Sequence, residues 1–261
     1  MPHTSRKIYA FKRRNHETFC KLTVTFLDNI ILIVRDEEHI LNFRWAESEN
    51  FLDYYELLKV INEPQFVISD GHTSIIKACK KLWKNVGFQR CLVHVSRDAQ
   101  RKLGKRSPHK VNHIFRHHIM KLPNIYILKD SKDWLEKFDS LYKKHKRFIE
   151  QQTPRVDLET GEIIGYYRTH KKLYSACYTI HKLRKKNMLF LHLENGIPNN
   201  SNCLEGGINS PLKNLLRCHR GISLERQKRM FEWYLLKRSN TPINSFINSI
   251  DFDFLYPKNG H

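Results

Sequence analysis

The stretch that decides the fold is Gln65–Arg101, QFVISDGHTSIIKACKKLWKNVGFQRCLVHVSRDAQR. Its apolar run Phe66–Ile68 predicts a short buried strand, and Asp70 and Gly71 follow where that strand ends. A helix is expected next, and then a second strand over residues 88–93. Strand, helix and strand make a βαβ unit, and ligand sites in such folds collect beyond the carboxyl ends of the strands. Asp70 therefore lies where a ligand site is expected, although an Asp-Gly pair is also a common turn and the local pattern alone favours the turn.

The composition indicates a polyanionic partner. The 261 residues contain 46 Lys plus Arg against 26 Asp plus Glu, a formal charge of +20. Nucleic acid fits this charge, and its binding should weaken with salt. No apolar run approaches the roughly 18 to 20 residues that span a bilayer, and the N-terminus has no signal-peptide core, so we expect a cytoplasmic protein without a membrane partner. The six cysteines lack paired spacing, which favours reduced thiols.

The segment before Phe66 predicts three strands and a helix. The strands are expected over residues 18–26, 29–34 and 40–45, and short polar turns between them favour an antiparallel meander. Asn50 can cap a helix that runs to about Ile61. The order βββαβ is that of the first part of a ribonuclease H-like fold, a scaffold whose enzymes bring acidic residues together around metal ions. Topology by itself makes this an analogy.

The middle of the chain is basic and helical. Residues 95–121 are densely basic, as expected of a phosphate-contacting surface or of a solvated helix face. Amphipathic helices are expected over residues 133–151 and 168–186 with a loop between them, and residues 188–193 form a strand-like apolar run. The fold class is therefore α/β, a ribonuclease H-like mixed sheet with an all-helical insertion and C-terminal helices. Five parts are expected: a basic arm 1–20, the first part of the core 21–110, the helical insertion 111–187, the last part of the core 188–240 and a tail 241–261.

The last informative segment, residues 198–239, carries another acid and another basic cluster. Glu205 lies near a helix start, and Arg217, His219 and Arg220 surround a helix end. These three basic residues are a phosphate grip or a C-terminal helix cap, and the pattern does not choose between the two. Ser223 can cap a final helix with an apolar inner face.

Three blocks together resemble the mutator-type DDE transposases of bacterial insertion sequences. They are SDGHTSIIKA at 69–78, QRCLVHVSR at 89–97 and NNSNCLEGGINSPLK at 199–213, the last followed by HRGIS and EWYL. The resemblance covers most of residues 29–239. It implies three acids on a ribonuclease H-like core that hold two divalent ions, Mg²⁺ or Mn²⁺, with Asp70 as the second acid, Glu205 as the third and a helical insertion between them.

Divalent ions explain why acids are needed. Mg²⁺ prefers oxygen ligands and combines one or two carboxylates with phosphate oxygens and waters. A pair of such ions can activate a water or a DNA 3′-hydroxyl and stabilise the leaving oxygen. Cleavage and strand joining are then one reaction with different nucleophiles. Cys91 and His94, a Cys-x2-His pair, are only half of a zinc site, so no zinc is assigned.

The first acid departs from the family pattern. The best register places Thr23 where the family has an aspartate, and Asp28 is the nearest acid, at an expected turn. The chain also begins close to the core, so a truncated or decayed copy is one interpretation. The sequence predicts a transposase that cuts and joins DNA, with a non-catalytic DNA-binding remnant as the alternative.

Partners follow from the same resemblance. They are double-stranded DNA, as element ends and target, and further copies of this chain on that DNA, in the bacterial cytoplasm and associated with the nucleoid. The residues expected to contact DNA are Arg97, Arg101, Lys102, Arg217, His219 and Arg220.

Overall fold

The computed structural model describes residues 19–26, 30–201, 205–219 and 221–239. Side chains are described for these residues except at 19, 23–26 and 205. Almost all of the expected basic arm, and the whole of the expected tail, lie outside this range, as do Asp28 and Arg220. The described chain forms two compact units. One contains the residues up to Val67, then His72–Val86 and those after Ser201; the other contains Ile68–Gly71 and Gly87–Ser201.

The expected meander is confirmed. The first strands are β1 (Phe19–Phe26), β2 (Ile30–Arg35) and β3 (Ile40–Ala46). β1 pairs with β2, and β2 with β3, both antiparallel. The pairing of β1 with β2 is uninterrupted from Lys21 to Phe26 and places backbone position 23 across from Ile33. With β4 (Phe66–Ser69) and β5 (Gly87–Arg90) these strands make one sheet in the order β3-β2-β1-β4-β5.

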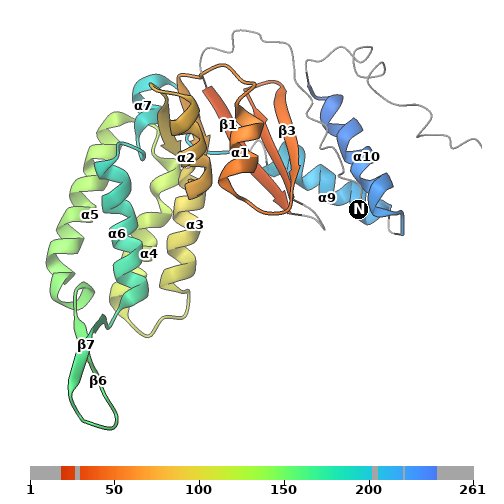
Figure 1. Cartoon of the computed structure of the whole chain (residues 1–261). Coiled ribbons are helices and arrows are strands. Elements are labelled where there is room, and N and C mark those ends of the chain that lie inside the picture. The colour runs from red at the N-terminus through yellow and green to blue at the C-terminus, as the bar shows by residue number, and fades with distance from the viewer. Residues whose placement is uncertain (1–18, 27–29, 202–204, 220, 240–261) are drawn as a thin grey trace, which may run out of the picture. The chain divides into compact units, whose positions relative to one another are not determined.

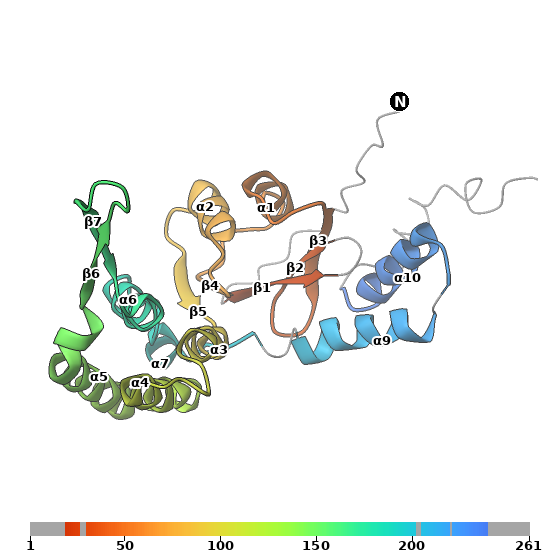
Figure 2. The same cartoon turned by 90° about the horizontal axis from the view of Figure 1, so that it is seen from below.

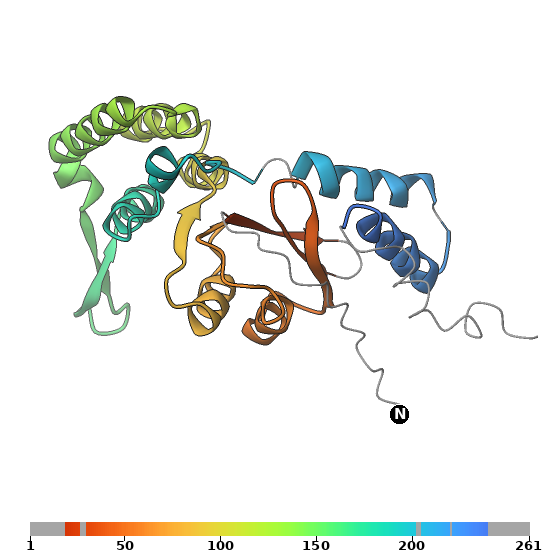
Figure 3. The same cartoon turned by 90° about the horizontal axis from the view of Figure 1, so that it is seen from above.

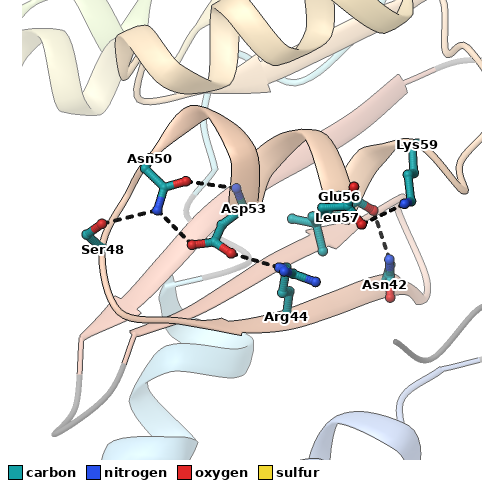
Figure 4. A network of polar contacts seen from close by, with 8 residues as sticks. All are labelled: Asn42, Arg44, Ser48, Asn50, Asp53, Glu56, Leu57 and Lys59. Atoms are coloured by element: carbon teal, nitrogen blue, oxygen red, sulfur yellow. Dashed lines mark hydrogen bonds and ion pairs between the residues drawn. The ribbon is translucent and has the colours of Figure 1, made fainter. Parts of the chain in front are cut away.

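Helix α1 (Phe51–Leu58) is tied to β3 through polar contacts (Figure 4). The side chain of Asn50 accepts a hydrogen bond from the backbone N–H of Asp53 at 2.9 Å, which is the predicted N-cap. The Asp53 carboxylate in turn accepts from Arg44 Nε at 2.9 Å, and both side chains are nearly buried. Asn42 donates to the carbonyl of Leu57 at 2.8 Å. The ion pair therefore ties the first turn of α1 to β3, and the Asn42 hydrogen bond ties its last turn.

The sheet of the first unit is covered on both faces (Figures 2 and 3). Helices α1 and α2 (Thr73–Leu82) pack on one side. On the other side are α9 (Ser210–Cys218) and α10 (Leu224–Leu236). A buried cluster joins Ile31, Ile33 and Phe43 of the sheet to Ile208 and to residues of both C-terminal helices. The predicted C-terminal helices are confirmed, including the cap of α10, where Ser223 Oγ accepts from the N–H of Arg226.

The βαβ unit around Asp70 is confirmed with one correction. The second strand was expected over 88–93 but ends at Arg90, and α3 (Leu92–Leu103) begins directly after Cys91. Buried residues along α3 recur at helical spacing, so the apolar residues that suggested a strand face the helical core. The apolar stripe therefore belongs to a helix that starts inside the expected strand.

The remainder of the second unit is mainly helical. Its helices are α4 (Lys110–Met120), the short 3₁₀ turn η1 (Leu122–Asn124), α5 (Leu128–Ile149), α6 (Lys171–Lys185) and α7 (Leu191–Asn195). The expected strand at 188–193 is wrong, because its second half forms α7.

The expectation of an all-helical insertion is also wrong. β6 (Gln152–Val156) and β7 (Ile163–Arg168) form a two-stranded antiparallel hairpin where a loop was expected. This hairpin extends beyond the ends of α5 and α6 (Figure 1). Its turn holds the polar residues that suggested a loop, while β7 is rich in β-branched and aromatic residues, which favour strands.

Candidate functional site

Asp70 occupies the position predicted for it, directly after β4. Residues Val67, Ile68 and Ser69 of that strand are buried, whereas Asp70 is half-buried. The backbone N–H of Gly71 donates to Ser69 Oγ at 3.1 Å, and Gly71 has a φ of +79°. A left-handed glycine thus turns the chain sharply beside a rigid strand. The carboxylate is placed at the carboxyl end of a buried strand and remains within reach of solvent.

Arg90 lies across this turn from the end of the neighbouring strand. The N–H of Cys91 donates to the carbonyl of Ser69 at 2.8 Å, which joins the ends of β4 and β5. The Arg90 side chain passes over Gly71 so closely that a Cβ at position 71 would overlap Nη1 and Cζ and lie 2.6 Å from Cδ. Residue 71 is therefore glycine for two reasons, its backbone conformation and the guanidinium above it.

The positive charge of Arg90 attracts the carboxylate of Asp70. Burial lowers the pKa of Arg90, while attraction to Asp70 and Asp98 opposes that shift, so the three charges interact. Arg90 Nε has no hydrogen-bond partner within the described part of the chain. Sequence reasoning did not single out this residue, because its role depends on which strands are neighbours. The available signal was a charged residue near the end of each of two short apolar segments, Asp70 directly after β4 and Arg90 as the last residue of β5.

Cys91 and His94 are in contact. His94 Nδ1 lies 3.1 Å from Cys91 Sγ, and the N–H of Ser201 donates to the same sulfur at 3.4 Å. Burial raises the pKa of the Cys91 thiol, but the hydrogen bonds from His94 and Ser201 outweigh this and lower the pKa overall. The N–H of Leu92 also donates to the carbonyl of Asn199 at 2.9 Å. These contacts fasten the segment that leads to Glu205 to the start of α3.

Among the described residues, no group of three His, Cys, Asp or Glu side chains lies close enough to hold a metal ion. Of the three expected ligands, Asp70, Glu205 and Asp28, only Asp70 has a described side chain. The backbone of Glu205 begins the π-helical turn η2 (Glu205–Asn209), which continues into α9. Asp28 lies outside the described residues. Backbone position 23 lies in the regularly paired part of β1.

The expected DNA contacts on α3 differ in availability. Arg97 and Arg101 are exposed and one helical turn apart, and Arg101 is paired with Asp98. Lys102 is half-buried and donates from Nζ to Ser175 Oγ at 3.1 Å, so it is anchored to α6. Of the three expected contacts on α3, Arg97 and Arg101 therefore have side chains exposed to solvent, whereas Lys102 is held against α6.

The second expected cluster follows α9. Arg217 and His219 are exposed, and Arg217 donates to the side chain of Asn214 one turn earlier. Arg220 lies outside the described residues. Because Arg217 is bound to a neighbouring amide and no acid in the described chain is paired with it, its charge stays available to an anion.

Comparison with known proteins supports one family. No described helix is long and apolar enough to cross a membrane. No curated protein matches the chain. The model of the Mutator family of transposases matches residues 37–188, more than half of the chain and including both Asp70 and Arg90. The chain therefore belongs to the Mutator transposase family.

Proposed function

We propose that this protein cleaves DNA and joins DNA strands by two-metal phosphoryl transfer on a ribonuclease H-like core. The observation that carries the proposal is the position of Asp70. It is a half-buried carboxylate at the carboxyl end of β4, in a chain that belongs to the Mutator transposase family. Ligand sites in α/β sheets collect at this end of the strands. The substrate would be double-stranded DNA, in keeping with the formal charge of +20.

Chain connectivity supports the convergence of Asp70 and Glu205. Ser69 is bonded to Cys91 through the backbone, and the sulfur of Cys91 accepts from Ser201. Glu205 then lies only four positions after Ser201, a stretch that spans at most about 14 Å when extended. The segment that carries Glu205 thus starts beside the strand end that carries Asp70. A structure of the metal-bound form in which these carboxylates lie more than roughly 10 Å apart would refute a shared two-metal site.

The donor chemistry fits Mg²⁺ or Mn²⁺. Asp70 and Glu205 would supply carboxylate oxygens, the ligand type that these ions prefer. Bound ions would activate a water or a DNA 3′-hydroxyl and stabilise the leaving oxygen. The protein itself holds Asp70 in place through the Gly71 turn and sets a positive charge, Arg90, beside it. Arg97 and Arg101 would bind the DNA backbone through their exposed guanidinium groups.

The first acid determines how active this site can be. With Thr23 in the regular β1 strand, the site has two protein carboxylates where the family has three. We therefore infer weak nicking by the unmodified chain. The alternative function, a DNA-binding remnant without catalysis, is favoured by the same threonine.

A nicking assay separates the two functions. Supercoiled plasmid carrying the element's ends is incubated with the full chain and Mn²⁺. We expect slow nicking that Asp70→Asn and Glu205→Gln abolish and that Thr23→Asp increases, whereas Asp28→Ala changes it little. If neither the unmodified chain nor Thr23→Asp cleaves DNA, the chain is a binding remnant. Strong cleavage by the unmodified chain that is lost in Asp28→Ala would instead identify Asp28 as the first acid.

DNA binding is tested by charge reversal with a matched control. Arg101→Glu combined with Lys102→Glu should weaken binding to unrelated DNA sequences equally and flatten the salt dependence, because phosphate contacts carry no sequence information. Lys80→Glu combined with Lys81→Glu, on the exposed end of α2, makes the same change in net charge. Equal loss of affinity in both double variants would show that only the overall charge matters and that α3 is not the DNA surface.

A further inference from the structure

The β6–β7 hairpin exposes an unusual amount of apolar surface. Its two strands pair only with each other among the described strands. Isolated two-stranded hairpins are marginally stable, and contiguous exposed apolar surface marks interaction sites. The exposed large side chains of the hairpin, with the exposed fraction of each, are Val156 43%, Leu158 99%, Ile163 56%, Ile164 58%, Tyr166 64% and Tyr167 55%.

The two outer edges of the hairpin are not equivalent. β6 contains Pro154, which has no backbone N–H and therefore blocks regular pairing along its edge. β7 reads Ile-Ile-Gly-Tyr-Tyr-Arg, without proline; it carries one bulge at Ile164, and the following residues Gly165 to Arg168 pair regularly with β6. The open edge is therefore that of β7, which can accept another strand.

Charge is distributed unevenly along the hairpin. The turn between the strands holds three acids and no base, although the whole chain is strongly basic. Asp157 is fixed there by the N–H groups of Glu159 and Thr160, and these hydrogen bonds lower its pKa. The opposite end of the hairpin carries five bases and the acid Glu150. The acids of the turn are Asp157, Glu159 and Glu162, and the bases at the other end are Lys146, Arg147, Arg168, Lys171 and Lys172.

We propose that β7 is a dimerisation edge, which pairs with β7 of a second copy of this chain about a two-fold axis. Two identical strands related by such an axis run antiparallel, so the acidic turn of each copy meets the basic end of the other hairpin. Within one copy the two ends are about 20 Å apart, the length of a six-residue strand, which exceeds the screening length of roughly 8 to 10 Å at moderate salt. The acidic turn and the basic end can therefore attract each other only between two copies of the chain. DNA is a poorer occupant, because the acidic turn repels phosphates.

The pairing goes beyond the proposed catalysis and is tested without DNA or metal. Sedimentation velocity of the full chain, over a wide range of concentrations, should show a monomer–dimer equilibrium. Tyr166→Lys places like charges near the two-fold axis and should weaken the dimer about tenfold or more. The matched control is Tyr178→Lys, the same exchange at a 55% exposed tyrosine on α6, and it should leave the dimer unchanged.

A charge exchange tests the register of the pairing. Glu159→Lys with Glu162→Lys should weaken the dimer, as should Lys171→Glu with Lys172→Glu, and the four changes together should restore it. Circular dichroism confirms that each variant is folded. The proposal is overturned if the chain is monomeric throughout, if Tyr166→Lys leaves the dimer intact, or if the fourfold variant stays weak. Tighter DNA binding by Tyr166→Lys without any change in sedimentation would instead make the hairpin a DNA contact.

Discussion

Replacing Gly71 by alanine should destabilise the protein by two separable mechanisms. The first is the φ of +79°, which costs an L-residue about 1–2 kcal/mol. The second is the collision with Arg90, whose guanidinium occupies the space that the new methyl group needs. Because Arg90 is a flexible side chain, it can move away, and the added cost is the loss of its buried position and of its attraction to Asp70, about 1 kcal/mol. We expect a total loss of about 2–3 kcal/mol in the free energy of unfolding.

The structure supplies a control for the backbone part. Gly196, at the end of α7, is left-handed with a φ of +65° and has open space where a Cβ would be built. Gly196→Ala should therefore show the first cost alone. Urea unfolding followed by far-ultraviolet circular dichroism gives both values, and the same measurements in an Arg90→Ala background complete a double-mutant cycle. In that background the cost of Gly71→Ala should fall to that of Gly196→Ala. If Gly71→Ala costs the same with and without Arg90, the guanidinium does not occupy this space and the contact with the Asp70 turn is refuted.

Three further predictions concern other parts of the chain. Burial lowers the pKa of His118 and His192 below the ordinary 6.5, so the folded state binds fewer protons than the unfolded state. Stability is then complete above pH 6.5, and the urea midpoint should fall as the pH drops below it. Replacing both by glutamine should reduce this fall without abolishing it, because burial also lowers the pKa of His170 and His181, and an unchanged fall would contradict the prediction. Cys218 is the one exposed cysteine of the described residues, and Cys218→Ser should remove one equivalent of thiol that reacts rapidly with Ellman's reagent; an unchanged fast phase would contradict its exposure. Asp53→Ala leaves Arg44 nearly buried without its carboxylate and should cost about 3–5 kcal/mol in urea unfolding, whereas Asp53→Leu with Arg44→Met should be close to neutral; equal losses in both would argue against a desolvation penalty.

Local patterns in the sequence were sufficient for the elements whose stability is local or repetitive. The meander from β1 to β3 follows from alternating apolar residues, and the start of α1 from the cap at Asn50. The position of Asp70 follows from a short apolar run that ends at an Asp-Gly pair. In each case a few consecutive residues carry the signal, because strand alternation and helix capping act over the neighbouring residues.

Features that depend on distant residues were decided by the tertiary structure. Arg90 lies over Gly71 only because β4 and β5 are neighbours in the sheet, and no pattern within either strand records that pairing. The boundary between β5 and α3 lies earlier than expected for a related reason. A short apolar run fits either a strand or a helix, and the surrounding core determines which one forms. The hairpin β6–β7 was missed because its turn residues dominate a polar loop pattern, while its strands are stabilised only by pairing with each other. Sequence therefore determined which residues carry charge and turn chemistry, and the fold decided which of them meet.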